Sequence, residues 1–297
     1  MNATQMYLFP EVTVQIVNTL YILGNGFDLY HNLKTRYVDF KQFASVLQTL
    51  EPFFCLDELW CNFEEALGSC DVDTVYSYVT SDKEIDYDHM MRSTIIIEDS
   101  PDEEFTPILD YVRKLFSEWI ASIDLRETKI KDRFSCLCPE SKYITFNYTR
   151  VLEEVYKIKS DSILHIHGEV EKPESIIVGH TTHYEVGDYS DYMSLLSYEL
   201  NARTKIVDSL NLFEKPTAKI INENFAFFKS LSKISTVLVF GHSYSSIDFP
   251  YFLEVKKCTS LDVKWYFHVY SNEDCVRLGN LIKFLEIPKE NYKVVAI

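Results

Sequence analysis

Four short polar segments carry the residue types that could do chemistry, and each directly follows an apolar stretch. They are residues 24–28, 145–149, 165–168 and 241–248. Parallel strands end at a common edge of their sheet, and open α/β sheets bind ligands at that edge. The spacing therefore predicts one ligand site built from four segments that are distant in sequence.

The first segment combines two glycines with a carboxylate. Gly24 and Gly26 allow the backbone of a strand-to-helix turn to approach a phosphate, and the helix start behind them offers free N–H groups. Asn25 and Phe27 complete the turn, and Asp28 can bind a ribose hydroxyl or an amide. The alternative is a tight turn without a ligand, in which Asp28 caps the helix.

The second and third segments supply an amide and two histidines. Asn147 follows a strand, where it can orient a ribose hydroxyl or a water molecule, or instead cap the next helix. We expect His167 to reach into a ligand cleft as an acid, a base or a hydroxyl partner. Strand alternation puts His165 on the same face, which would suit a metal ion. No third ligand has a matching spacing, so we predict no metal.

The last segment is compatible with two kinds of site. Gly241, His242 and Ser243 stand at a strand end, where they suit contacts to a phosphate or a ribose. Asp248 lies a few residues further on. The same segment nearly matches the G-x-S-x-G turn of serine hydrolases. In that alternative Ser243 is the nucleophile and His268, inside a predicted strand, is the base.

Strands and helices alternate along the chain in a way that would present these segments. Apolar runs predict strands at residues 17–23, 142–146, 162–166, 175–178, 236–240, 263–270 and 292–297. Helical spacing dominates residues 51–135 and 190–231, except for an acidic stretch at residues 98–104 that we expect to be an exposed loop. The pattern predicts an α/β fold with a doubly wound, mainly parallel, Rossmann-like sheet. We expect one domain over residues 1–297, with residues 51–135 as a helical insertion.

Composition and charge limit the classes of partner and the cellular compartment that we expect. The formal net charge is −16, which argues against direct binding of nucleic acid. The seven cysteines have irregular spacing, which is typical of free thiols in a reducing compartment. We find neither a signal peptide nor an apolar run of transmembrane length, so we expect a cytoplasmic protein that does not contact membranes.

Taken together, these segments resemble the AbiH family of bacterial phage abortive-infection proteins. The matching stretches are residues 21–40, 60–67, 145–148, 165–168 and 241–252, in the order expected of the family. The same pattern is similar to a distant SIR2, or sirtuin-type, domain. In that domain a glycine-rich turn, an asparagine after a strand, a His-Gly pair and a Gly-x-Ser turn surround NAD.

The resemblance implies a role for each segment. Asn147 would position the attacking water, and His167 would contact or deprotonate a ribose hydroxyl. The turn at residues 24–28 would wrap the pyrophosphate and the nicotinamide end, with added contacts from Thr35 and Tyr37. The remaining cofactor-binding residues would be Gly241, His242 and Ser243, which hold the adenosine side, and Asp248.

The departures from sirtuins indicate hydrolysis rather than deacylation. Sirtuin deacylases carry a zinc module with two cysteine pairs, and this chain lacks it. The resemblance implies an NAD glycohydrolase that depletes NAD during phage infection and releases nicotinamide and ADP-ribose. Such an enzyme must be silent in healthy cells, so we expect control by a protein partner, a homo-oligomer or a nucleotide signal. Two alternatives stay open, a non-catalytic nucleotide-binding module that signals to a partner and a serine hydrolase based on Ser243.

Overall fold

The chain folds into two compact units, each assembled from segments that are separated in sequence. The computed structural model describes residues 18–44, 63–135, 137–187 and 197–296. The sheet unit takes its described residues from Met1–Arg36, Ile120–Ile176 and Pro216–Ile297, and the helical unit from Tyr37–Trp119 and Ile177–Lys215. The helical unit thus combines most of the first predicted helical segment with part of the second.

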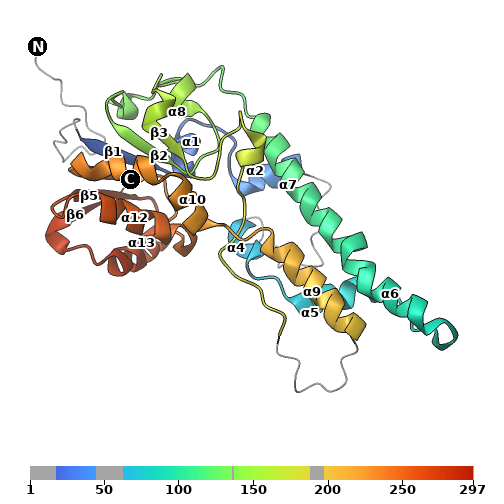
Figure 1. Cartoon of the computed structure of the whole chain (residues 1–297). Coiled ribbons are helices and arrows are strands. Elements are labelled where there is room, and N and C mark those ends of the chain that lie inside the picture. The colour runs from blue at the N-terminus through green and yellow to red at the C-terminus, as the bar shows by residue number, and fades with distance from the viewer. Residues whose placement is uncertain (1–17, 45–62, 136, 188–196, 297) are drawn as a thin grey trace, which may run out of the picture. The chain divides into compact units, whose positions relative to one another are not determined.

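The sheet unit is built on a six-stranded sheet in which every pair of neighbouring strands is parallel (Figure 1). The strands lie in the order β3-β2-β1-β4-β5-β6. Their bounds are β1 Thr19–Leu23, β2 Lys142–Thr145, β3 Ile163–His165, β4 Thr236–Phe240, β5 Lys264–Val269 and β6 Tyr292–Ala296. This is the doubly wound order: β2 and β3 are added on one side of β1, and β4, β5 and β6 on its other side. The predicted α/β, Rossmann-like fold is confirmed.

The central strands are apolar because both of their faces are covered. Every residue of β1 is buried, and so are four of the five residues of β4. Strands of parallel sheets are covered on both faces, so they read as continuous apolar runs rather than alternating ones. This is why the sequence predicted these two strands within a few residues of their observed bounds.

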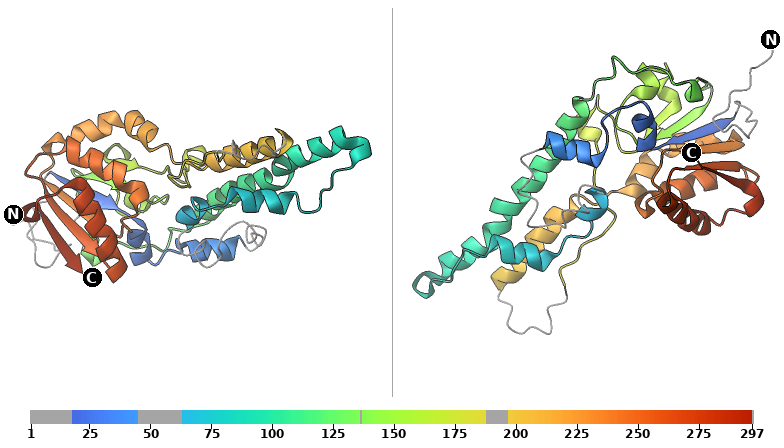
Figure 2. Two further views of the ribbon diagram at one scale, coloured as in Figure 1. Left: turned by 90° about the horizontal axis from the view of Figure 1, so that it is seen from below. Right: turned by 180° about the vertical axis from the view of Figure 1, so that it is seen from behind.

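Helices connect the strands of the sheet unit and pack beside them (Figure 2). Helices α10, α11 and α12 pack together, and α13 packs against α12 and β5. The bounds are α1 Asn25–Tyr30, α8 Val151–Glu154, α10 Thr217–Glu223, α11 Phe225–Lys229, α12 Phe249–Cys258 and α13 Asn272–Leu285.

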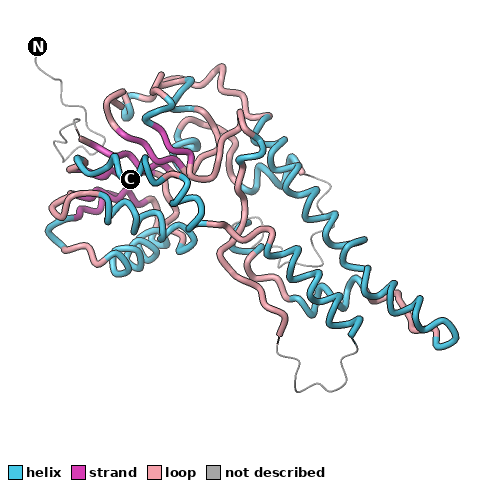
Figure 3. Tube along the Cα trace, in the orientation of Figure 1, coloured by secondary structure: helices cyan, strands magenta, loops and turns pink. Residues whose placement is uncertain are grey.

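Among the described residues, all strands lie in the sheet unit, so the helical unit consists of helices and loops (Figure 3). Helix α9 packs against α5, α6 and the π-helix η3. The bounds are α2 Tyr37–Phe43, α4 Phe63–Leu67, α5 Val72–Val79, α6 Met90–Ser100, η3 Pro101–Phe105, α7 Thr106–Ala121 and α9 Ser197–Asn211. None of the described helices is long and apolar enough to cross a membrane.

The acidic stretch that we expected to be a loop is helical. It spans the end of α6 and the π-helix η3, which leads into α7. Lys205 of α9 lies 2.6 Å from an Asp99 oxygen and 2.8 Å from an Asp102 oxygen, and Phe105 is fully buried. A cation from a distant helix and a buried aromatic anchor stabilise a segment whose local composition favours a loop.

The strand expected at residues 175–178 does not form. Pro173–Ser175 make a 3₁₀ turn, and the chain leaves the sheet unit after Ile176. Ile176 and Val178 are buried, so their apolar side chains are explained by packing and not by membership of a strand. Parts of the predicted elements at residues 17, 51–62, 190–196 and 297 lie outside the described residues.

Candidate functional site

The four polar segments leave the sheet from neighbouring strands. Gly24 follows β1, Phe146 follows β2, Ile166 follows β3 and Gly241 follows β4. These strands stand side by side in the order β3-β2-β1-β4 and run in one direction. Their carboxyl ends share one edge, where open α/β sheets bind ligands.

Glycines in the first and last segments allow two loops to touch. A Cβ on Gly26 would lie 2.5 Å from Gly241 Cα, and a Cβ on Gly24 would lie 2.5 Å from Gly241 O. The Gly26 N–H donates to Gly241 O (2.8 Å), and the Gly24 N–H donates to Phe240 O (3.0 Å). The sequence predicts N–H groups free for a phosphate at this turn, but these two donate to the last residue of β4 and to the first residue after it.

Other residues around the first turn have partners within the chain. Asn25 Nδ2 donates to Thr35 O (2.8 Å), and Thr35 Oγ1 donates to Asn25 Oδ1 (2.6 Å). Phe27 is buried in the core, with its ring centroid 4.9 Å from that of Phe134. Tyr37 is the first residue of α2 and belongs to the helical unit. Asn25 and Thr35 therefore fix the loop behind α1, and the Phe27 side chain serves the core.

Asn147 is buried and held by both its side chain and its backbone. Its Nδ2 donates to Asp28 Oδ1 (3.0 Å), and its N–H donates to Thr145 Oγ1 (3.1 Å). Thr149 Oγ1 donates to the second oxygen of Asp28 (2.7 Å). Because the amide nitrogen of Asn147 donates to Asp28, its amide oxygen is the atom that can accept a hydrogen bond from a water or a hydroxyl. Asn147 does not cap the next helix, since the N-cap of α8 is Arg150.

Asp28 titrates far from its ordinary range. Burial raises the pKa of its carboxyl to about 7, against the lowering effect of the hydrogen bonds from Thr149 and Asn147. Asp28 also does not cap α1, whose N-cap is Gly24. A buried carboxyl that titrates near neutrality and holds a polar side chain is typical of functional sites.

Asp248 lies between two buried histidines. His242 Nε2 is 3.2 Å from Asp248 Oδ2, and His167 Nε2 is 3.6 Å from Asp248 Oδ1. The Tyr244 N–H donates to His242 Nδ1 (2.8 Å), so the proton of a neutral His242 is on Nε2 and faces the carboxylate. Asp248 is the N-cap residue of α12, where negative charge is favourable, but its side chain makes no capping hydrogen bond.

Ring contacts connect the Asn147 segment with this histidine pair. The ring of Phe146 lies 5.3 Å from that of His167 and 4.5 Å from that of His242, centroid to centroid. The ring of Tyr148 lies 6.3 Å from that of His167. The rings that flank Asn147 thus both lie against the ring of His167, whereas the Asn147 side chain itself binds Asp28.

The serine-hydrolase arrangement finds no support in these contacts. Ser243 is exposed, and no hydrogen bond joins it to His268 within the described residues. His268 Nε2 instead accepts from an Arg133 nitrogen (2.9 Å), and its ring packs on Phe240. Burial, with the nearby Arg133 charge, lowers the pKa of His268 to about 3, which makes it a poor general base near neutrality.

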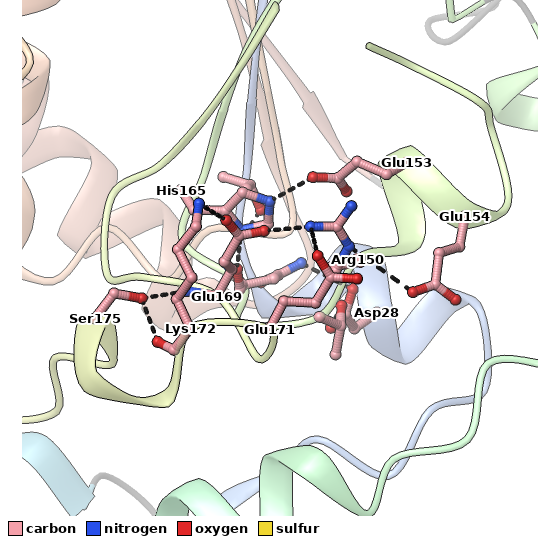
Figure 4. Close-up of polar contacts among 12 residues, drawn as sticks. Asp28, Arg150, Glu153, Glu154, His165, Glu169, Glu171, Lys172 and Ser175 are labelled. Atoms are coloured by element: carbon pink, nitrogen blue, oxygen red, sulfur yellow. Dashed lines mark hydrogen bonds and ion pairs between the residues drawn. The ribbon is translucent and has the colours of Figure 1, made fainter. Parts of the chain in front are cut away.

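His165 has partners that the sequence did not indicate. Its Nε2 is 2.9 Å from Glu153 Oε1, and its Nδ1 is 3.1 Å from Asn147 O. Glu153, His165 and Glu169 each offer a ligand atom, and these atoms lie within 4.8 Å of one another (Figure 4). His165 ends β3, whereas His167 lies in the turn behind it and contacts Asp248. The two histidines do not share a set of partners, contrary to what strand alternation predicted.

Thr149 and the two glutamates are residues of these clusters that the sequence did not predict. Thr149 stands two residues after Asn147, and both side chains bind Asp28. Residues two apart in an extended segment point to the same side, so this spacing could have predicted Thr149. Glu153 lies on α8 and Glu169 lies beyond β3, so only the fold brings them to His165. No local spacing indicates that pairing.

Comparison with known proteins gives one match. A family model described as "Bacteriophage abortive infection AbiH" matches residues 20–269. The matched span begins in β1 and ends with β5, so it includes all four polar segments. No curated protein and no solved structure matches the chain significantly.

Proposed function

We propose that this chain, which belongs to the AbiH family of bacteriophage abortive-infection proteins, is an NAD glycohydrolase. The family match covers most of the chain and supports a role in phage abortive infection. The proposed activity is cleavage of the bond between nicotinamide and ribose, which removes NAD from the infected cell.

The proposal depends most on the contacts that orient the Asn147 side chain and surround His167. Its amide nitrogen is bound by a buried carboxylate, and its flanking rings contact His167. An oriented amide oxygen can hold a water molecule, and a neighbouring imidazole can accept a proton from a hydroxyl. These contacts support assigning to Asn147 and His167 the two polar roles that hydrolysis at a ribose carbon requires.

In the proposed reaction a water oxygen attacks C1′ of the nicotinamide ribose. The C1′–N bond breaks, its electron pair leaves with nicotinamide, and the water loses a proton. NAD⁺ and water thus become nicotinamide, ADP-ribose and H⁺. The Asn147 amide oxygen orients the water, and His167 contacts or deprotonates a ribose hydroxyl.

Buried carboxylates suit the cationic end of this substrate. Asp28 and Asp248 are both buried, and they contact Asn147 and His167 respectively. Positive charge develops at the sugar carbon when a glycosidic bond breaks, and fixed negative groups in a low dielectric stabilise it. We place the nicotinamide ribose beside these two residues and the adenosine side beside Gly241, His242 and Ser243.

Control of the activity is part of the proposal, because uncontrolled loss of NAD would kill the host. We propose that a protein partner, a homo-oligomer or a nucleotide signal releases the activity during infection. The assay therefore includes the protein encoded beside this chain's gene.

Substitution of the two proposed catalytic residues tests the assignment. Asn147→Ala and His167→Ala should each lower nicotinamide release by at least about 100-fold, the usual contribution of a positioned polar catalyst. Asn272→Ala and His89→Ala are matched controls at exposed positions and should leave release unchanged. Circular dichroism checks that each variant is folded. Full activity in both Asn147→Ala and His167→Ala would refute the assigned roles.

Two further measurements separate the alternatives. NAD binding without any turnover would favour a nucleotide-binding module. Labelling of Ser243 by a fluorophosphonate probe would favour a serine hydrolase, and failure to label would count against it.

A further inference from the structure

We propose that Glu153, His165 and Glu169 bind a divalent transition-metal ion at the end of β3. The three side chains come from α8, from the last residue of β3 and from the segment behind it. Figure 4 shows them gathered in one place, and one ligand atom from each lies within 4.8 Å of the others. The proposal does not rest on the proposed NAD chemistry, although His165 contacts the backbone oxygen of Asn147.

The contacts of His165 place an acceptor oxygen at each of its two ring nitrogens. Asn147 O can only accept a hydrogen bond, so the Nδ1 that faces it carries a proton. A neutral ring then presents its Nε2 lone pair to a Glu153 carboxylate oxygen at 2.9 Å. Two lone pairs at that distance repel unless a proton or a metal ion lies between them.

The same contact gives His165 the setting of a metal ligand. Metal-binding histidines nearly always donate their second ring N–H to a carbonyl or a carboxylate, which fixes the ring and its tautomer. Here Asn147 O would be that acceptor. The 2.9 Å between Nε2 and Oε1 is close to the distance between two adjacent ligand atoms that each lie about 2.1 Å from one metal ion.

Glu153 provides an independent indication of a ligand. Its side chain is only 7% exposed, and its Oε2 is buried without a hydrogen-bond partner. A buried carboxylate oxygen without a partner is costly. A metal ion bound by this carboxylate would compensate for that cost.

Lys172 marks a position where positive charge is already favourable. Its Nζ lies 2.6 Å from Glu169 Oε1, whereas Arg150 binds Oε2 at 2.6 Å. The Lys172 side chain is 64% exposed, so it can withdraw into solvent. A metal ion would take its place on Oε1 while Arg150 keeps Glu169 oriented.

The ligand set indicates the class of ion. Two carboxylates with one imidazole suit Mn²⁺, Fe²⁺ or Zn²⁺, whereas Mg²⁺ and Ca²⁺ prefer oxygen ligands alone. This inference replaces the expectation from sequence that the chain holds no metal.

The experiment uses the whole chain, freed of metal with a chelator and titrated with Mn²⁺ while electron paramagnetic resonance follows the bound ion. We expect one bound Mn²⁺ per chain and a ¹⁴N modulation from an imidazole, which His165→Gln should remove. Glu153→Gln and Glu169→Gln should each weaken binding by at least about tenfold, as even loss of an outer-shell partner does.

Two variants keep the test decisive if a ligand variant is poorly folded. Lys172→Met removes the competing ammonium at an exposed position and should tighten Mn²⁺ binding. Glu154→Gln, on the same helix but outside the three ligands, should leave binding unchanged. Binding that is absent, or that neither Glu153→Gln nor Lys172→Met alters, would overturn the proposal and leave a protonated His165 as the cation. NAD is not used in this titration, so its result is independent of the proposed function.

Discussion

Asp28 is the residue on which the geometry of the candidate site depends most. It receives hydrogen bonds from Asn147 and Thr149, and its ionised form fixes which end of the Asn147 amide is presented. Burial raises the pKa of Asp28 to about 7, so its charge changes near neutral pH. NAD cleavage is therefore expected to increase as the pH rises through about 7.

The raised pKa of Asp28 also predicts a pH-dependent stability. Between about pH 4 and pH 7 the folded protein keeps a proton that the unfolded chain has lost, so the free energy of unfolding falls as the pH rises. Asp28→Asn removes this effect. From pH 5 to pH 8 the variant should gain at most about 3 kcal/mol relative to wild type, measured by urea denaturation. A difference between the two proteins that is constant with pH would contradict the raised pKa.

At the scale of elements, the close approach of the β1 and β4 loops is the feature that shapes the site. Gly26 and Gly241 touch backbone to backbone, which a larger residue prevents. Gly26→Ala should destabilise the protein by at least about 2 kcal/mol through overpacking. Gly279→Ala is the matched control within α13, where a Cβ meets nothing within 4 Å. It should stabilise the protein by about 0.5–1 kcal/mol, because alanine favours a helix.

Thermal or urea unfolding of these two glycine variants distinguishes the two effects. Equal changes in both variants would mean that the loops are not packed as described.

The elements that the sequence predicted well are those whose pattern is set locally. The strands β1 and β4 are continuous apolar runs because both of their faces are buried. The polar segments that follow the strands lie at one edge because the strands are neighbours in the sheet. The acidic stretch in α6 and η3 was predicted wrongly because Lys205 lies on a helix about a hundred residues away. The sequence also did not reveal that the N–H groups of Gly24 and Gly26, expected to be free for a phosphate, donate to Phe240 O and Gly241 O.

At the scale of the whole molecule, the residues proposed for chemistry belong to the sheet unit. The helical unit is made of two segments, Tyr37–Trp119 and Ile177–Lys215, that are separated in sequence by part of the sheet unit. Local periodicity predicted helices in both segments but not that α9 packs on α5 and α6. The net charge of −16 suits a protein whose partners are not nucleic acids.

The most direct test of the proposed activity is the release of nicotinamide from NAD by the purified protein. NAD is incubated with the chain alone and with the product of the neighbouring gene, and nicotinamide and ADP-ribose are measured by chromatography. We predict that both products appear in equal amounts under at least one of these conditions, and that Asn147→Ala suppresses them. Binding of NAD with no nicotinamide released under either condition would contradict it.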